Sequence, residues 1–161
     1  MAMRNQGERG AVAVEFALIL PILVMLLVGI VTTGVSYSNA LGATNAVREG
    51  TRFGATADSS PSWAADVIAR TRATQFDDPG SETKICVQLY KQGAGEVHGS
   101  CSAGLSMPTA AQDPKVPAGL TAGTCVVRVL ATRPFTINTV LKQWDRVMTR
   151  FAVARYERES C

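Results

Sequence analysis

A single carboxylate, Glu15, stands at the start of a long apolar segment. From Phe16 to Val31 there is no charged or strongly polar side chain, and the apolar character continues to Val35. A carboxylate costs about 2.5–3.5 kcal/mol at the middle of a bilayer, so carboxylates in such segments are usually paired with a cation. The alternative is that Glu15 lies at the depth of the lipid headgroups, where water solvates it.

A cation for Glu15 would arise if the chain were cut between Gly10 and Ala11. The new α-amino group of Ala11 would be mostly protonated at pH 7. It would lie about one helical turn from Glu15, so the two groups could neutralise each other within one chain or between adjacent subunits.

The four cysteines, Cys86, Cys101, Cys125 and Cys161, all follow the apolar segment. An even number of cysteines in an oxidising compartment favours two disulfides, for which three connectivities exist; four reduced thiols are the alternative. If strands at 124–135 and 147–156 run antiparallel, Cys125 approaches Cys161, and Cys86 is left for Cys101. The cysteine spacings lack a Cys-x-x-Cys pair, so no metal site is expected.

The other reactive side chains form no catalytic pattern. His98 is the only histidine and lies in a Gly/Ser-rich stretch, and Ser100 and Ser102 flank Cys101 without a nucleophile-elbow motif. We therefore expect no enzymatic activity, cofactor or small-molecule substrate. The net charge of +3 is mild and the basic residues are scattered among acids, so no nucleic-acid partner is expected either.

Residues 11–35 are predicted to form a transmembrane helix. About 20 apolar residues at roughly 1.5 Å per residue cross a hydrocarbon core of about 30 Å. Arg4 and Arg9 precede the segment, whereas the first charges after it begin at Arg48. The positive-inside rule then places residues 1–10, a basic leader that is removed or frayed, in the cytoplasm, with the rest of the chain exported.

The helical pattern continues beyond the membrane, through residues 36–57. Small residues recur every four positions, at Gly34, Ser38, Gly42, Ala46, Gly50 and Gly54. Such a ridge lets another backbone approach closely. Two readings stay open: the ridge packs against helices of other subunits, or it lets the chain's own sheet or second helix lie close. One continuous helix is expected from about Ala11 to Ala57.

Residues 58–161 are predicted to form an exported α+β head domain. Ser60 and Pro61 favour a short helix from Pro61 to about Gln75, and Asp77 to Gly80 favours a turn. Strands are expected at 83–90, 124–135 and 147–156, with a Gly/Ser/Pro-rich loop at 92–123 and a short helical turn at 136–145. The predicted fold is a three-stranded antiparallel sheet laid on the long helix.

The N-terminal part of the chain resembles a known family. Gly10 followed by an apolar stretch, with Glu15 and Phe16 at the fifth and sixth positions after it, is similar to the class III leader of type IV pilin-like proteins. Residues 9–21 and 45–55 resemble the TadE-like minor pilins of the tight-adherence pilus. The resemblance implies a prepilin peptidase that cleaves between Gly10 and Ala11, with Glu15 and Phe16 used in processing or assembly. It also implies a bacterial inner-membrane protein with other pilin subunits and the pilus assembly machinery as partners.

A secreted binding domain is the alternative to a pilin-like protein. Ser38, Asn39 and Ala40 are small residues of the kind that a conventional signal peptidase accepts, and cleavage after Ala40 would release the head. The apolar segment is longer than a usual signal core, and Glu15 is unexpected in one. The first residue of the mature protein distinguishes the two readings: Ala11 for the pilin-like protein, Leu41 for the secreted domain.

Overall fold

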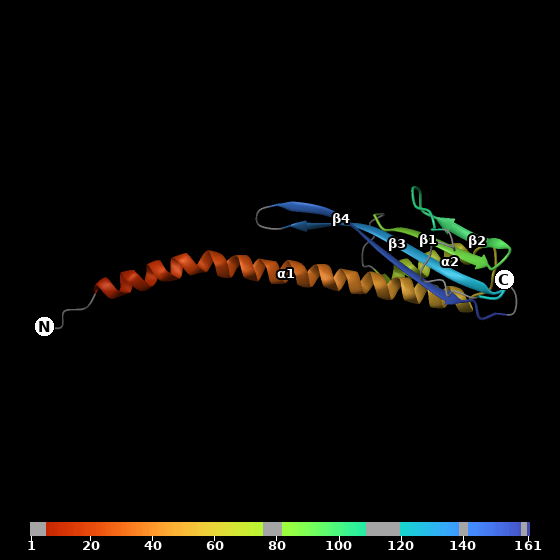
Figure 1. Cartoon of the computed structure of the whole chain (residues 1–161), viewed down its shortest axis with the longest axis horizontal. Helices are drawn as coiled ribbons and strands as arrows, with labels where there is room; N and C mark the ends of the chain where they lie inside the picture. Colours follow the sequence, from red (N-terminus) through yellow and green to blue (C-terminus); the bar gives the residue numbers. More distant parts are fainter. Residues whose placement is uncertain (1–5, 76–81, 109–119, 139–141, 159–160) are drawn as a thin grey trace. The chain divides into compact units, whose positions relative to one another are not determined.

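The computed structural model describes residues 6–75, 82–108, 120–138, 142–158 and 161 (Figure 1). Two helices and four strands follow in the order α1 (Gln6–Thr56), α2 (Trp63–Gln75), β1 (Lys84–Lys91), β2 (Gly95–Cys101), β3 (Cys125–Asn138) and β4 (Gln143–Arg155). The chain divides into two compact units. The first comprises Met1–Ser38 and Thr136–Asp145, and the second comprises Asn39–Phe135 and Arg146–Cys161.

Helix α1 runs without interruption through the apolar segment and the small-residue ridge, as expected. It begins at Gln6 rather than Ala11, so residues 6–10 of the leader are helical. These residues include no proline, so nothing in them removes a helical hydrogen bond. Pro21 lies inside the helix, and the helix ends at Thr56, where the N–H of Ala57 still donates to the carbonyl of Phe53 at 2.9 Å.

Helix α2 begins at Trp63, two residues later than predicted. The carbonyl of Ser62 accepts a bond from the N–H of Asp66 at 3.0 Å, and the Ser62 hydroxyl donates to the Asp66 carboxylate at 3.0 Å. Ser62 is therefore the N-cap in place of Ser60. The turn expected at residues 77–80 lies outside the described residues.

The antiparallel sheet has four strands, not three, in the order β2-β1-β3-β4. The missed strand, β2, lies within the stretch that was predicted as a loop from 92 to 123. Gly93 and Gly95 have positive φ angles of 88° and 101°, which allow the chain to turn back so that β2 pairs with β1.

The prediction of a helical turn at 136–145 is wrong. β3 continues to Asn138 and β4 begins at Gln143, so both predicted strands are longer than expected. Thr136 and Ile137 are β-branched, which favours an extended backbone over a helical turn. Residues 139–141 lie outside the described residues.

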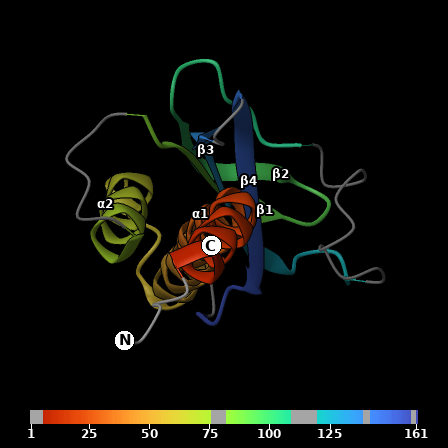
Figure 2. The same ribbon diagram turned by 90° about the vertical axis from the view of Figure 1, so that its left-hand side faces the viewer.

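The core of the second unit lies between the helices and one face of the sheet. On that face β1 and β3 align Ile85 with Ala131, Val87 with Val129 and Leu89 with Val127. Val47 and Ala55 of α1 and Trp63 and Val67 of α2 complete the same buried cluster. Figure 2 shows α2 on one side of α1 and strands on the other, and the residues of α1 from Asn39 onward are those that join this core.

Candidate functional site

The apolar segment of α1 is exposed along its length. Phe16 is 59% exposed, Leu18 71%, Leu27 63% and Ile30 71%. None of the most apolar stretch of the helix is buried inside the structure, and the helix is long and apolar enough to span a membrane. A core helix of a water-soluble domain would bury such side chains, since each fully buried one contributes about 1.5–3 kcal/mol.

The residues expected to direct processing and assembly lie near the start of this exposed helix. Gly10 lies within α1, exposed, and a Cβ built on it would meet no atom within 4 Å. Glu15 and Phe16 follow on the same helix and are both exposed. Gly10 thus lies on an accessible turn of α1, and Glu15 and Phe16 are positioned by the same helix.

The small-residue ridge divides into an exposed part and a buried part. Gly34 and Ser38 are exposed, Gly42 is half-buried, and Ala46, Gly50 and Gly54 are buried. The buried part belongs to the second unit, where it packs within the chain. Of the two readings of the ridge, intrachain packing therefore holds for Ala46, Gly50 and Gly54, while the structure shows no intrachain contact around Gly34 within 4 Å of a Cβ built there.

Helix α2 approaches α1 closely at Gly50 and Gly54. A Cβ on Gly50 would lie 2.0 Å from Oγ1 of Thr71, and one on Gly54 would lie 3.0–3.1 Å from Val67, Val127 and Trp63. The indole N–H of Trp63 donates to the carbonyl of Gly54 at 3.0 Å. These two glycines therefore set the distance between the helices, which is the role that a small residue has in close packing.

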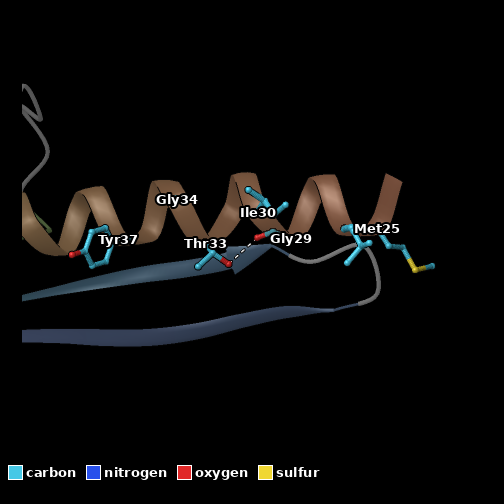
Figure 3. A pocket seen from close by; sticks show the side chains of 7 residues that line it. Met25, Gly29, Ile30, Thr33, Gly34 and Tyr37 are labelled. Carbon is cyan, nitrogen blue, oxygen red and sulfur yellow. Dashed lines mark hydrogen bonds between the residues drawn. The ribbon is translucent and has the colours of Figure 1, made fainter. Parts of the chain in front are cut away.

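An apolar groove of about 610 Å³ runs along the exposed part of α1 (Figure 3). Its lining residues are spaced as one helical face: Met25, Leu26, Gly29, Ile30, Thr33, Gly34 and Tyr37. The hydroxyl of Thr33 donates to the carbonyl of Gly29 at 2.7 Å, so this hydroxyl is satisfied by its own helix. Gly29 and Gly34 leave the helix backbone open at the floor of the groove.

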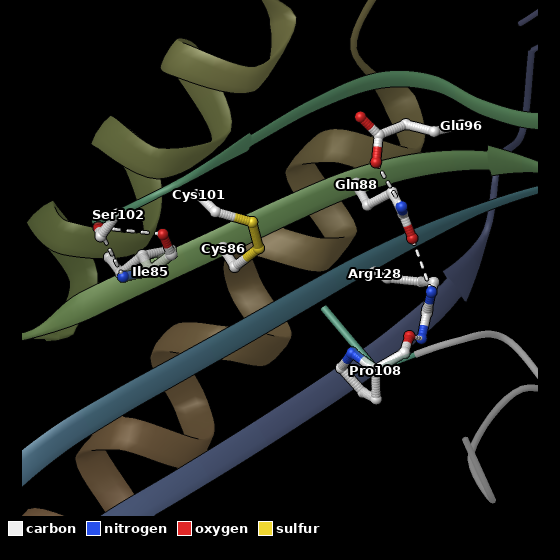
Figure 4. The surroundings of a disulfide bond; sticks show 8 residues. All are labelled: Ile85, Cys86, Gln88, Glu96, Cys101, Ser102, Pro108 and Arg128. Carbon is white, nitrogen blue, oxygen red and sulfur yellow. Dashed lines mark hydrogen bonds between the residues drawn. A yellow bond between two sulfur atoms is a disulfide. The ribbon is translucent and has the colours of Figure 1, made fainter. Parts of the chain in front are cut away.

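The structure contains disulfides between Cys86 and Cys101 and between Cys125 and Cys161, the two pairs favoured by the strand order (Figure 4). Their Cα atoms are 4.0 and 6.4 Å apart, within the roughly 7 Å that a disulfide can bridge. The first joins β1 to β2, and the second joins the start of β3 to the segment after β4. Both lie in the second unit.

Sequence reasoning missed a buried arginine on the face of the sheet that carries the Cys86–Cys101 bond. Arg128 is 1% exposed, donates to Oε1 of Gln88 at 2.6 Å and also donates to the carbonyl of Pro108 (Figure 4). Its guanidinium carbon lies 5.6 Å from the centre of the Phe151 ring. Arg128 therefore joins Pro108, in the long segment after β2, to the sheet. In the sequence Arg128 is a single charge within the apolar run Val126 to Leu130, and this pattern alone does not indicate burial.

His98 lies in β2, opposite Leu89 of β1, rather than in a loop. Within the described ranges, His, Cys, Asp and Glu side chains do not gather in groups of three or more that could hold a metal ion.

The comparison with protein families gives a match within helix α1. Residues 10–52 match the model of the TadE-like protein family. This TadE-like region starts at the glycine of the expected cleavage site and includes Glu15, Phe16, the whole exposed apolar segment and the ridge as far as Gly50. It ends within the buried part of α1, so the sheet lies outside it. No curated protein and no solved structure matches the chain.

Proposed function

We propose that this protein is a membrane-anchored, pilin-like component of a tight-adherence pilus system with a structural, non-enzymatic role. The observation that supports this most is the coincidence of two findings on one element. The TadE-like match covers residues 10–52, and the same stretch includes an apolar helix whose most apolar part has no buried residues. A helix of this kind needs a bilayer or neighbouring apolar helices to cover it.

The proposed orientation and export of the chain follow from its charges and its cysteines. Arg4 and Arg9 keep the N-terminus in the cytoplasm, and the second unit is exported to a compartment where its two disulfides form. A prepilin peptidase cleaves between Gly10 and Ala11. The protein then joins other pilin subunits or the assembly machinery, at the base of a filament or within it.

Glu15 has a defined task in this proposal. Cleavage creates an ammonium group on Ala11, and Glu15 of a neighbouring subunit neutralises it as the two helices pack in an apolar setting. An unpaired charge in that setting costs several kcal/mol, so the pair makes correct entry into the assembly favourable and entry of unprocessed chains unfavourable.

The test of the proposed function is the processing of a Gly10→Leu variant. The bulky side chain occupies the position before the scissile bond while the apolar segment is untouched, so the variant should insert into the membrane and stay at full length. The measurement is N-terminal sequencing of protein expressed with the pilus peptidase. Gly29→Leu is the matched control, because a Cβ at Gly29 also meets no atom within 4 Å, and this variant should be cut normally. Cleavage of Gly10→Leu at Ala11 would contradict the proposal.

A secreted binding domain is the second candidate, and one structural observation favours it. The second compact unit begins at Asn39, close to the proposed signal-peptidase site after Ala40. Against it, residues 38–41 lie within the uninterrupted helix α1, which would have to unwind before cleavage. A mature N-terminus at Leu41, with the head recovered in the medium, would establish this candidate in place of the first.

A further inference from the structure

The end of β3 and the start of β4, which the structure describes at residues 136–138 and 142–145, belong to the same compact unit as the apolar half of α1. Figure 3 shows the ends of β3 and β4 running beside the helix near Thr33 and Gly29. We call these residues the hairpin tip. Its position matters because Gly29 and Thr33 precede Val35, the end of the apolar segment, by only about 9 and 3 Å along the helix.

One stripe of α1 in this unit is less exposed than its surroundings. Val28, Thr32 and Ser36 are half-buried, whereas the residues between them are exposed. The hydroxyl of Thr32 donates to the carbonyl of Val28 at 2.8 Å, and that of Ser36 donates to the carbonyl of Thr32 at 2.9 Å. The hydroxyls of this stripe are therefore satisfied by the backbone of their own helix.

The hairpin tip has the side chains that favour the boundary between lipid and water. Trp144 is 46% exposed, and Nζ of Lys142 lies 5.0 Å from the centre of its ring. The hydroxyl of Thr136 donates to the carboxylate of Asp145 at 3.0 Å, which ties β3 to β4 beside Trp144. Tryptophan gathers at membrane interfaces because its ring is apolar while its N–H is polar, and lysine extends its ammonium toward the headgroups.

We propose that the hairpin tip is a second membrane contact, lying in the headgroup layer of the bilayer that α1 crosses. Trp144 lies at the boundary of the hydrocarbon, and Lys142 binds lipid phosphate. The proposal rests on the membrane anchoring proposed above. It follows from placement: a segment of the same compact unit that runs beside Gly29 and Thr33 lies close to the depth where the apolar helix leaves the bilayer. The tip thereby restricts rotation of the anchor about its own axis.

The test uses the two tryptophans of the full chain, of which one is buried and the other is exposed. Trp63 is 1% exposed in the core of the second unit, whereas Trp144 is exposed on the tip. The protein is reconstituted in vesicles of phosphatidylcholine and phosphatidylglycerol that carry bromine either near the headgroup or near the end of the acyl chains. Bromine near the headgroup should quench part of the emission of the wild type, and Trp144→Phe should abolish this quenching, since Trp63 is out of reach.

A third variant separates failure of this inference from failure of the membrane anchor. Leu26→Trp in the Trp144→Phe background puts the probe in the middle of the apolar segment, where Leu26 is 60% exposed. Deep bromine should quench it. Quenching of this probe without any of Trp144 would overturn the hairpin contact and leave the anchor standing. Absence of both would overturn both proposals. Aqueous iodide, which quenches tryptophans exposed to water, tests the alternative. If Trp144 is protected from iodide only at a high ratio of protein to lipid, a second copy of the chain covers it and the lipid contact is overturned.

The role of Lys142 is tested by Lys142→Glu. Reversal of this charge should reduce the quenching of Trp144 by headgroup bromine in the anionic vesicles, because the tip is then repelled from lipid phosphate. The loss should be smaller in vesicles of phosphatidylcholine alone. Equal quenching of both proteins in both kinds of vesicle would overturn the assignment of Lys142 to phosphate.

Discussion

The two ends of helix α1 share a four-residue spacing of small side chains and differ in what surrounds them. Gly34 near the membrane end has no atom within 4 Å of a Cβ built on it, whereas Gly50 has Oγ1 of Thr71 at 2.0 Å. Large apolar residues such as Leu18 and Ile30 are 71% exposed at one end, while Val47 is 1% exposed at the other. One periodic pattern therefore occurs in two settings: the first end is exposed, and the second is the spine of a folded head.

This comparison predicts that changes at the open end alter processing and assembly, while changes at the buried end alter the free energy of unfolding. The substitutions at Glu15 and Gly34 each have a counterpart at the other end of α1, so that either half of the comparison can fail separately, and the two disulfides are compared with each other within the head.

The largest effect is expected at Glu15. Glu15→Ala should insert normally, because a charge has been removed from the apolar segment, and it should enter the pilus system poorly even when it is cleaved at Ala11. Loss of a buried charge partner costs about 3–5 kcal/mol, so incorporation should fall by two orders of magnitude or more. The measurements are N-terminal sequencing, co-purification with other pilus proteins and surface piliation.

Glu49→Ala is the matched control at the buried end of α1. Glu49 pairs with Arg70 of α2 at 2.9 Å, and their side chains are 34% and 52% exposed. A pair that is open to solvent contributes at most about 1 kcal/mol, so this variant should lose little stability and no incorporation. Equal incorporation of cleaved Glu15→Ala and Glu49→Ala would show that the open end needs no charge pair, and would favour a Glu15 solvated by water at headgroup depth.

The disulfides are expected to give the next largest effect, confined to the head. In the chain-entropy view, the bond that spans 36 residues stabilises by about 4 kcal/mol and the bond that spans 15 by about 3 kcal/mol. Replacing both Cys125 and Cys161 by serine should therefore lower the free energy of unfolding more than replacing Cys86 and Cys101, without changing membrane insertion. Denaturant unfolding in detergent measures this. Peptide mapping of the non-reduced wild type checks the pairing itself. A Cys86–Cys125 bond or free thiols in the map would contradict the pairing.

Alanine at two glycines is expected to have smaller effects than the loss of a disulfide, and here the sign should reverse along the helix. At Gly50 the new methyl group meets Thr71, which is 0% exposed and whose hydroxyl already donates to the carbonyl of Val67 at 2.7 Å, so α2 has to move at a cost of about 1–3 kcal/mol. At Gly34 the methyl group meets nothing, and the helix should gain up to about 1 kcal/mol. Helix content and unfolding in detergent report both changes, and destabilisation at Gly34 would indicate a contact within the chain at the open end.

The parts of the fold that sequence reasoning predicted are those where side-chain periodicity is long. The apolar segment and the ridge together cover about forty residues of one helix, so α1 followed directly from hydropathy and spacing. β1 alternates Ile85, Val87 and Leu89 with more polar neighbours and was also predicted. β2 was missed because Val97 is its only β-branched residue. The signal that could have located it is the pair Gly93 and Gly95, which marks a turn between Tyr90 and Val97.

The division of the ridge could not be predicted, because glycine and alanine at every fourth position are compatible with any close neighbour. The placement of α2 shows that the close neighbours of Gly50 and Gly54 belong to the same chain. Arg128 was missed for a different reason. A single charge in a run of valines suggests an edge or an exposed face, whereas here Gln88 and the carbonyl of Pro108 supply the acceptors that permit its burial.

The end of α1 depends on residues that are made long after it. The hydroxyl of Tyr156 donates to the carbonyl of Ala57 at 2.8 Å, Nε of Arg158 donates to that of Thr56 at 2.7 Å, and the N–H of Glu157 donates to that of Ala55 at 3.0 Å. The partners in the first two bonds are 99 and 102 residues apart. At a synthesis rate of about 5–20 residues per second, the helix waits roughly 5–20 s for them. During that time the carbonyls of Ala55, Thr56 and Ala57 lack these three donors, whereas α2 and β3, which are made earlier, can already cover Gly50 and Gly54. A chain that stops before Tyr156 therefore keeps a helix α1 whose last carbonyls have none of these three partners.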